Sequence, residues 1–90
     1  MKFDNLFAQR LSERLEQLNC TLKEFAPGTI DNPTARLLIQ YDPNILAHTL
    51  LEAIQAEITN TSSKDYNYHI EYPEFFGNNT CGINIQYSAK

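Results

Sequence analysis

The feature that most constrains this chain is a change of hydrophobic period at Asp42-Pro43. In residues 34–41 every second side chain is apolar, and these side chains share one face of a strand; this is the period of a strand with one buried face. Residues 43–59 then carry apolar side chains at helical spacing, with Asp42 placed as a cap and Pro43 in the first turn. The pattern predicts a strand that leads directly into a helix lying on the same sheet.

The same two periods assign the rest of the chain. Residues 4–19 have apolar side chains every three or four positions and predict a helix, with Asp4 as its cap and Phe3 packed against its first turn. Alternation and turn residues predict the other elements: a short edge strand over 21–26, a polar loop over 59–65, a strand over 66–72 stopped by Pro73, a loop over 73–80 and a strand over 81–88.

The order α-β-β-α-β-β predicts an α+β fold, a two-layer α/β sandwich over residues 1–90 as a single domain. It is the order of a circularly permuted ferredoxin-like unit. We therefore expect four mainly antiparallel strands. Numbered in chain order as 1 (21–26), 2 (34–41), 3 (66–72) and 4 (81–88), they are expected to lie in the spatial order 3-4-2-1, with both helices on one face. Strands 2 and 4 are expected to lie parallel at the centre of the sheet.

The junction Leu37-Leu38-Ile39-Gln40-Tyr41-Asp42-Pro43, followed by an amphipathic helix, resembles the corresponding unit of ferredoxin-like metal-chaperone domains. The resemblance covers about 20 residues and implies a fold element only. The C-x-x-C metal motif of those domains is absent here.

Charge and hydropathy argue against duplex nucleic acid and membranes as direct partners. The formal net charge is -4, and the basic residues form no run that could neutralise successive phosphates of a duplex. No window approaches the roughly 18 apolar residues of a membrane span, and the charged N-terminus is unlike a signal peptide, so we expect a cytoplasmic protein. Cys20 and Cys81 are expected to be reduced and far apart, at the starts of strands that run in opposite directions.

No cluster of residues indicates catalysis, a cofactor or a metal. His48 is expected on the wet face of the second helix beside Glu52, and His69 on the outer face of the third strand without further ligand types nearby. Cys81 lies in the phase of the core, with no base expected within reach. We therefore expect a protein that is not an enzyme and has no cofactor.

Two surfaces are candidates for binding a partner. One is the uncovered face of the sheet, which is expected to present Gln40, Glu71, Asn84 and Gln86, together with Arg36, Leu38, Asn67 and His69. The other is the loop with Phe75 and Phe76, adjacent rings that cannot easily both be buried from a loop, and with the nearby acid Glu74. A second-half acidic surface of Glu52, Glu57, Asp65, Glu71 and Glu74 would suit a basic partner.

The resulting hypothesis is a small, acidic, non-catalytic protein-binding module, an adaptor or a stoichiometric inhibitor of a larger macromolecular complex. One form of it is a phage-encoded inhibitor of a nucleic-acid-handling host complex. The first alternative is an RNA or single-strand nucleic-acid-binding sheet, although the tyrosines fall in the phase of the core rather than of the open face. The second is a homodimer that binds a small ligand, or catalyses a reaction, at its interface.

Overall fold

The computed structural model describes residues 5–29, 31–61, 66–71 and 73–89. The expected cap at Asp4, its neighbour Phe3, and Asp65 lie outside the described residues. Within these ranges the structure has two helices and five strands: α1 (Asn5–Glu16), β1 (Thr21–Ala26), β2 (Thr34–Gln40), α2 (Ala47–Thr61), β3 (Tyr66–Ile70), β4 (Glu74–Phe76) and β5 (Thr80–Ala89).

The strands form one sheet in the order β1-β2-β5-β3, and β4 pairs with β5 beyond the end of β3. Every pairing between the described strands is antiparallel, including the central one between β2 and β5. The expectation of a parallel central pair was therefore wrong. Alternation identifies a strand but is the same whichever way the strand runs.

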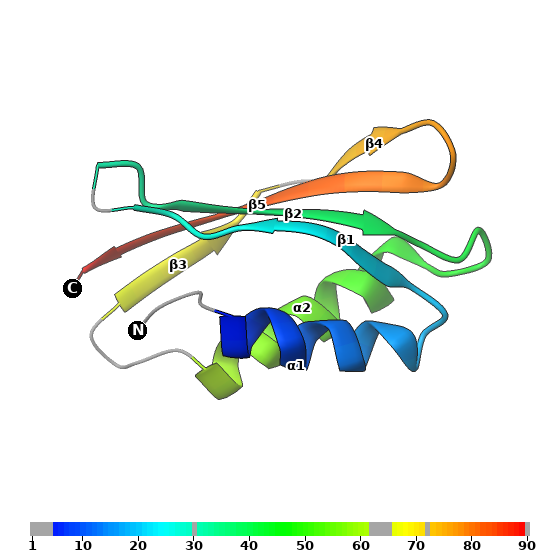
Figure 1. Cartoon of the computed structure of the whole chain (residues 1–90), viewed down its shortest axis with the longest axis horizontal. Helices are drawn as coiled ribbons and strands as arrows, with labels where there is room; N and C mark the ends of the chain where they lie inside the picture. Colours follow the sequence, from blue (N-terminus) through cyan, green and yellow to red (C-terminus); the bar gives the residue numbers. More distant parts are fainter. Residues whose placement is uncertain (1–4, 30, 62–65, 72, 90) are drawn as a thin grey trace.

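Both helices lie below the sheet in Figure 1, where α1 packs beside α2. One hydrophobic core fills the space between the two layers. Its fully or nearly fully buried side chains come from the inner faces of β2 and β5 and from both helices: Ala35, Leu37, Ile39, Cys81, Ile83, Ile85, Phe7, Leu11, Leu15, Leu50, Ile54 and Ile58. Beside this core, the ring of Phe25 on β1 lies 5.9 Å from that of Phe7 on α1.

Helix α1 ends three residues earlier than its apolar pattern predicts, because residue 19 adopts a left-handed conformation. Asn19 has a φ of 59°. The N–H of Cys20 donates to the carbonyl of Leu15 (2.9 Å), and the N–H of Asn19 donates to that of Glu16 (3.1 Å). This is the Schellman motif, which gives the last carbonyls of a helix new donors and turns the chain away from the helix axis. It directs Cys20 into the core and the following residues into β1.

Helix α2 begins at Ala47 rather than at residue 43. Asp42 instead closes a turn, because its carbonyl accepts from the N–H of Ile45 and its carboxylate Oδ1 accepts from the N–H of Asn44, each at 2.9 Å. Asp followed by Pro is as favourable in a β-turn as at a helix start. As a consequence Leu46, expected in the buried stripe, is 62 % exposed.

Both outer strands of the sheet are interrupted. On β1 the register shifts between Leu22 and Glu24, which leaves Lys23 as an extra residue opposite β2. On the other side, the chain takes four steps from Ile70 to Glu74 while β5 takes three between their partners, so the pairing with β5 changes register between β3 and β4, where Pro73 lies.

Candidate functional site: the β4–β5 hairpin and the open sheet face

The segment expected as a loop over 73–80 is a hairpin. Phe76 pairs with Thr80, and the turn between them contains Asn78 and Asn79, whose φ angles are 62° and 56°. Asparagine tolerates positive φ better than most residues, which is why this sequence can turn here. The carbonyl of Asn79 accepts from the backbone N–H of Tyr41 (2.8 Å), which fastens the turn to the end of β2. Figure 1 shows the hairpin rising away from the helices at one end of the sheet.

The two phenylalanines lie on opposite faces of this hairpin. Phe75 pairs with the buried Cys81, so it lies on the helix side, where its ring meets that of Tyr41 edge-on with centroids 5.9 Å apart. Phe76 lies on the open face of the sheet. Phe75 is 49 % exposed and Phe76 41 % exposed, so each ring is held by the fold and still reaches solvent.

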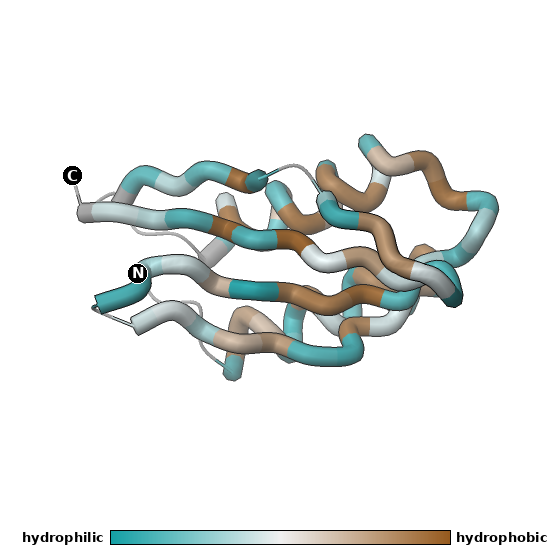
Figure 2. The backbone as a smooth tube through the Cα atoms, turned by 90° about the horizontal axis from the view of Figure 1, so that it is seen from above, coloured by the Kyte–Doolittle hydropathy of each residue, from teal (hydrophilic) through white to brown (hydrophobic). Residues whose placement is uncertain are grey.

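Gly82 allows the ring of Phe76 to lie close to the sheet. A Cβ atom at Gly82 would be 3.1 Å from Cε2 of Phe76 and 3.4 Å from Nη2 of Arg36. The missing side chain therefore leaves space where an aromatic ring and a guanidinium approach each other on the open face. Tyr41 and Phe75 thus form an aromatic contact on the helix side of the sheet, whereas Phe76 lies on its open face. Figure 2 shows hydrophobic and hydrophilic segments alternating along the central part of the sheet.

The rest of the open face is polar and partly ordered by Glu71. Its two carboxylate oxygens accept hydrogen bonds from the side-chain amides of Asn84 (3.3 Å) and Gln86 (2.5 Å). These bonds fix the orientation of both amides. Gln40 is exposed at the other end of this face, on β2.

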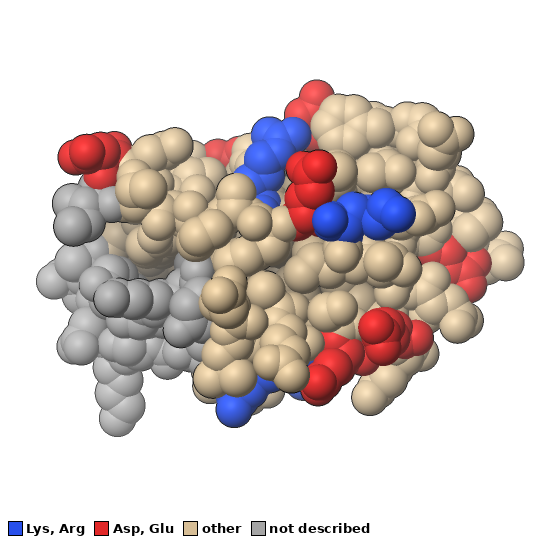
Figure 3. Space-filling model, viewed as in Figure 1, with Lys and Arg blue, Asp and Glu red and all other residues tan. Residues whose placement is uncertain are grey.

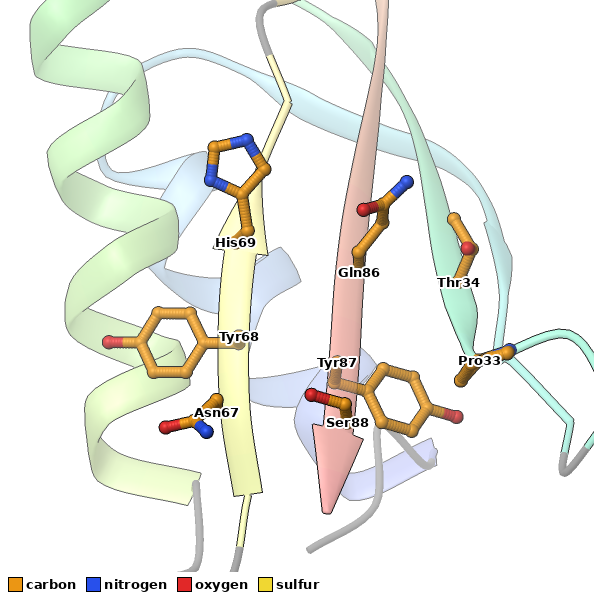
Figure 4. Close-up of a pocket in the computed structure, with 8 residues that line it drawn as sticks. All are labelled: Pro33, Thr34, Asn67, Tyr68, His69, Gln86, Tyr87 and Ser88. Atoms are coloured by element: carbon orange, nitrogen blue, oxygen red, sulfur yellow. The ribbon is translucent and has the colours of Figure 1, made fainter. Parts of the chain in front are cut away.

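A shallow hollow of about 470 Å³ lies on the same face, toward the C-terminal end of β5 (Figure 4). His69, Gln86 and Thr34 form one row across three strands, because His69 pairs with Gln86 and Gln86 with Thr34. The other lining residues are Pro33, Asn67, Tyr68, Tyr87 and Ser88. None of the lining side chains is an acid, a lysine or an arginine.

Charge is distributed unequally along the described chain. Its basic residues are Arg10, Arg14, Lys23 and Arg36, and all precede residue 37. In the view of Figure 3, the basic side chains lie near the middle of the molecule and along the helices. The end that carries the hairpin shows acidic and uncharged side chains in the same view. Glu74 is exposed beside Phe75. Glu57, expected on the acidic surface, is instead buried between the helices, where its Oε2 accepts from Nε of Arg14 at 2.8 Å.

The groups that could carry chemistry lie apart. His48 is exposed on α2 and His69 on β3. Cys20 and Cys81 are free, as predicted, and both belong to the buried core. Burial, together with the interaction with Cys20, raises the pKa of the Cys81 thiol to about 11. The two cysteines were expected far apart because β1 and β5 were expected to run in opposite directions, and that premise is wrong: both strands run antiparallel to β2, which lies between them.

The structure brings some of the predicted partner-binding residues together and separates others. Glu71, Asn84 and Gln86 are in contact, whereas Phe75 and Phe76 share a strand but not a face. Sequence reasoning missed Tyr41 and Leu46, because both were assigned to buried stripes. It also missed Gly82, although a glycine in the open-face phase of a strand is itself a signal for close approach of another group.

The comparisons with known proteins add no assignment: no family model, curated protein or solved structure matches this chain. Among the residues that the structure describes, no group of three or more His, Cys, Asp or Glu side chains could hold a metal ion. None of the described helices is long and apolar enough to cross a membrane.

Proposed function

We propose that this chain is a small, acidic, non-catalytic protein-binding module that acts as an adaptor or a stoichiometric inhibitor of a larger complex. The observation that carries the proposal is the pair of adjacent phenylalanines, 49 % and 41 % exposed, at the end of a fastened hairpin. An inhibitor encoded by a phage against a host complex that handles nucleic acid is one form of this function, in which acidic groups would occupy a basic groove.

The geometry of the rings supports an anchoring role. Tyr41 holds Phe75 edge-on, and the bare backbone of Gly82 lets Phe76 lie against the sheet beside Arg36. Aromatic and arginine side chains dominate the binding energy of many interfaces. Rings already held in one orientation lose little side-chain entropy when a partner covers them.

A non-catalytic role is favoured by where the reactive groups lie. The Cys81 thiol is buried, and its raised pKa keeps it protonated at neutral pH, so it is a poor nucleophile. The two histidines are on different elements, α2 and β3. The proposed compartment is the cytoplasm, where both thiols would stay reduced.

The test is affinity capture from the native host with the wild-type chain and with Phe75→Ala/Phe76→Ala. The matched control is Leu6→Ala, which removes another exposed apolar side chain, 52 % exposed, from α1. The captured protein is then purified and titrated by calorimetry. We expect the double variant to weaken binding by about thirtyfold or more, corresponding to about 2 kcal/mol, and to melt within a few degrees of wild type. Unchanged affinity in the double variant would contradict the proposal.

A second candidate function is binding of single-stranded RNA on the open face. It is favoured by the approach of Arg36 and Phe76 over Gly82, because an aromatic ring and a guanidinium both stack on bases. Its test is fluorescence anisotropy with a labelled oligouridine at two salt concentrations, with Arg36→Gln as the variant. A small-ligand site at a homodimer interface is a third reading, for which the shallow hollow beside His69 is the candidate.

The finer fold assignment is also a proposal. The strand order β1-β2-β5-β3 with antiparallel neighbours supports a circularly permuted ferredoxin-like sheet whose helices share one face. The open face would then be the surface left free for a partner.

A further inference from the structure

We infer that the open face of the sheet binds a second copy of this chain. The two copies pack face to face about a two-fold axis that runs along the strands, between β2 and β5. This inference goes beyond the proposed function and does not depend on it. Phe75 and its contact with Tyr41 lie on the helix side of the sheet, so they remain available to a different protein when the open faces are covered.

The pairing of the strands establishes which side chains share the open face. One row crosses β1, β2, β5 and β4 through successive partners: Glu24, Leu38, Gly82 and Glu74. In the next row Arg36 on β2 pairs with Asn84 on β5, and the carboxylate of Glu71 accepts from the side-chain amide of Asn84. Both rows lie on the side away from the helices, because they alternate along β2 and β5 with side chains of the core.

The two halves of this face differ in charge. The basic side chains of the described strands are Arg36 on β2 and Lys23 in the bulge of β1, and Glu24 beside them only partly offsets their charge. The other half contains Glu71 and Glu74, and the described residues of β3, β4 and β5 include no lysine or arginine. Within the described chain, no salt bridge engages any of these five side chains. A two-fold axis between the halves places each half of one copy over the opposite half of the other.

The same axis brings apolar side chains together at the centre. Leu38 is half-buried on the open face, although the core lies on the opposite side of the sheet. Because Leu38 and Gly82 are partners in the central strand pair, the axis places Leu38 of one copy over Gly82 of the other, where the ring of Phe76 lies. Sheets packed face to face are about 10 Å apart, a gap that leucine and phenylalanine side chains can fill. Phe76, 41 % exposed in one copy, would be covered by the second.

The charge pattern is less suited to other occupants. A nucleic acid on the open face would place phosphates against Glu71 and Glu74. A uniformly basic protein segment would meet Arg36, and a uniformly acidic one would meet the two glutamates. A second copy complements both halves at once.

The first experiment measures association of the purified chain by sedimentation equilibrium from about 5 to about 500 µM, where we expect a concentration-dependent dimer. Phe76→Ala should raise the Kd of the dimer about tenfold or more, because the ring lies at the centre of the contact. The matched control is Phe75→Ala, which removes the adjacent ring from the helix side and should leave the Kd within about twofold of wild type. Thermal melts of both variants establish that they are folded.

The second experiment tests the orientation of the copies by exchanging charge. Lys23→Glu/Arg36→Glu makes both halves of the face negative, and Glu71→Lys/Glu74→Lys makes both halves positive, so each variant alone should remain monomeric. An equimolar mixture of the two should form a heterodimer, because each half again meets its opposite. The control Glu13→Lys/Glu52→Lys makes the same change of charge at exposed positions on the helices and should still dimerise.

The outcomes separate this inference from the proposed function. A wild-type chain that is monomeric up to about 500 µM, or a mixture of charge variants that does not associate, would overturn the inference and leave the proposed function standing. Dimerisation weakened by Phe75→Ala but not by Phe76→Ala would place the contact on the helix side and overturn it as well. A monomeric chain that binds oligouridine, with loss of binding in Arg36→Gln, would assign the open face to RNA. A dimer that captures no other protein would support the inference and contradict the proposed function.

Discussion

Arg14 on α1 donates from Nε to Oε2 of Glu57 on α2 across 2.8 Å, and Glu57 is the most deeply buried charged residue in the described chain, 4 % exposed. The contact joins the two helices beside the hydrophobic core, to which Leu15 of α1 and Ile58 of α2 belong. A carboxylate removed from water in this way is stable only while its partners remain.

Removing the Arg14 guanidinium should therefore lower the free energy of unfolding more than removing a surface charge does. We expect Arg14→Ala to lower the free energy of unfolding by about 1–3 kcal/mol, below the full value for a buried pair because Arg14 is itself partly exposed. The measurement is urea denaturation at pH 7, with Arg10→Ala, an exposed arginine on the same helix, as the control. Equal effects of the two substitutions would show that the contact contributes no more than a surface charge.

Substitutions at the centre of the core are expected to lower the free energy of unfolding most. Ile39 on β2 and Leu50 on α2 are almost completely buried. Replacing either with alanine should lower the free energy of unfolding by about 2–5 kcal/mol, because a cavity remains where the side chain was. His48→Ala, on the exposed side of α2, is the control and should change stability by less than about 0.5 kcal/mol in the same thermal melts.

The left-handed residue at the end of α1 predicts an order of stabilities at position 19. Asn19→Ala should lower the free energy of unfolding by about 1 kcal/mol, because a φ near 59° is energetically less favourable for alanine than for asparagine. Asn19→Gly should match or exceed wild type, because glycine is the residue most often found at this position of the Schellman motif. Thermal melts of the two variants test this, and an alanine variant as stable as the glycine variant would contradict it.

The raised pKa of Cys81 predicts a loss of stability in base. An unfolded chain releases this thiol proton near pH 9, whereas the folded chain keeps it to about pH 11. Deprotonation therefore stabilises the unfolded state first, and the free energy of unfolding should fall between pH 9 and pH 11, by up to about 2–3 kcal/mol. Cys81→Ala keeps every tyrosine and should show a shallower fall; parallel curves for the two proteins would contradict this origin of the pH dependence.

Alternation predicted the central strands well because their two faces meet different surroundings. Leu37 and Ile39 face the helices while Arg36 and Gln40 face solvent, so the sequence of β2 records its position in the fold. The alternation of apolar and polar residues does not depend on the direction of a strand, so the antiparallel pairing of β2 with β5 was not predicted.

The hairpin escaped prediction for the opposite physical reason. At its end of the sheet, Phe75 and Phe76 are both partly exposed, so neither face imposes a buried side chain and no alternation arises. Pro73 was interpreted as a stop, and β3 does end before it, but β4 resumes the pairing with β5 directly after Pro73. The hydrogen bonds of Glu71 depend on the register between β3 and β5, so the residues could be named from the sequence but their contact could not.

The interruptions of the outer strands also govern how copies of this chain behave when crowded together. Amyloid-like stacking needs a continuous row of free backbone donors and acceptors against which an incoming strand can align. On one side the extra residue Lys23 breaks the row and places a positive charge there, and on the other Pro73 removes a donor between β3 and β4. The described edges of this sheet thus offer only short segments on which a fibril could grow. The exposed aromatic side chains of the hairpin are therefore not combined with a long free sheet edge.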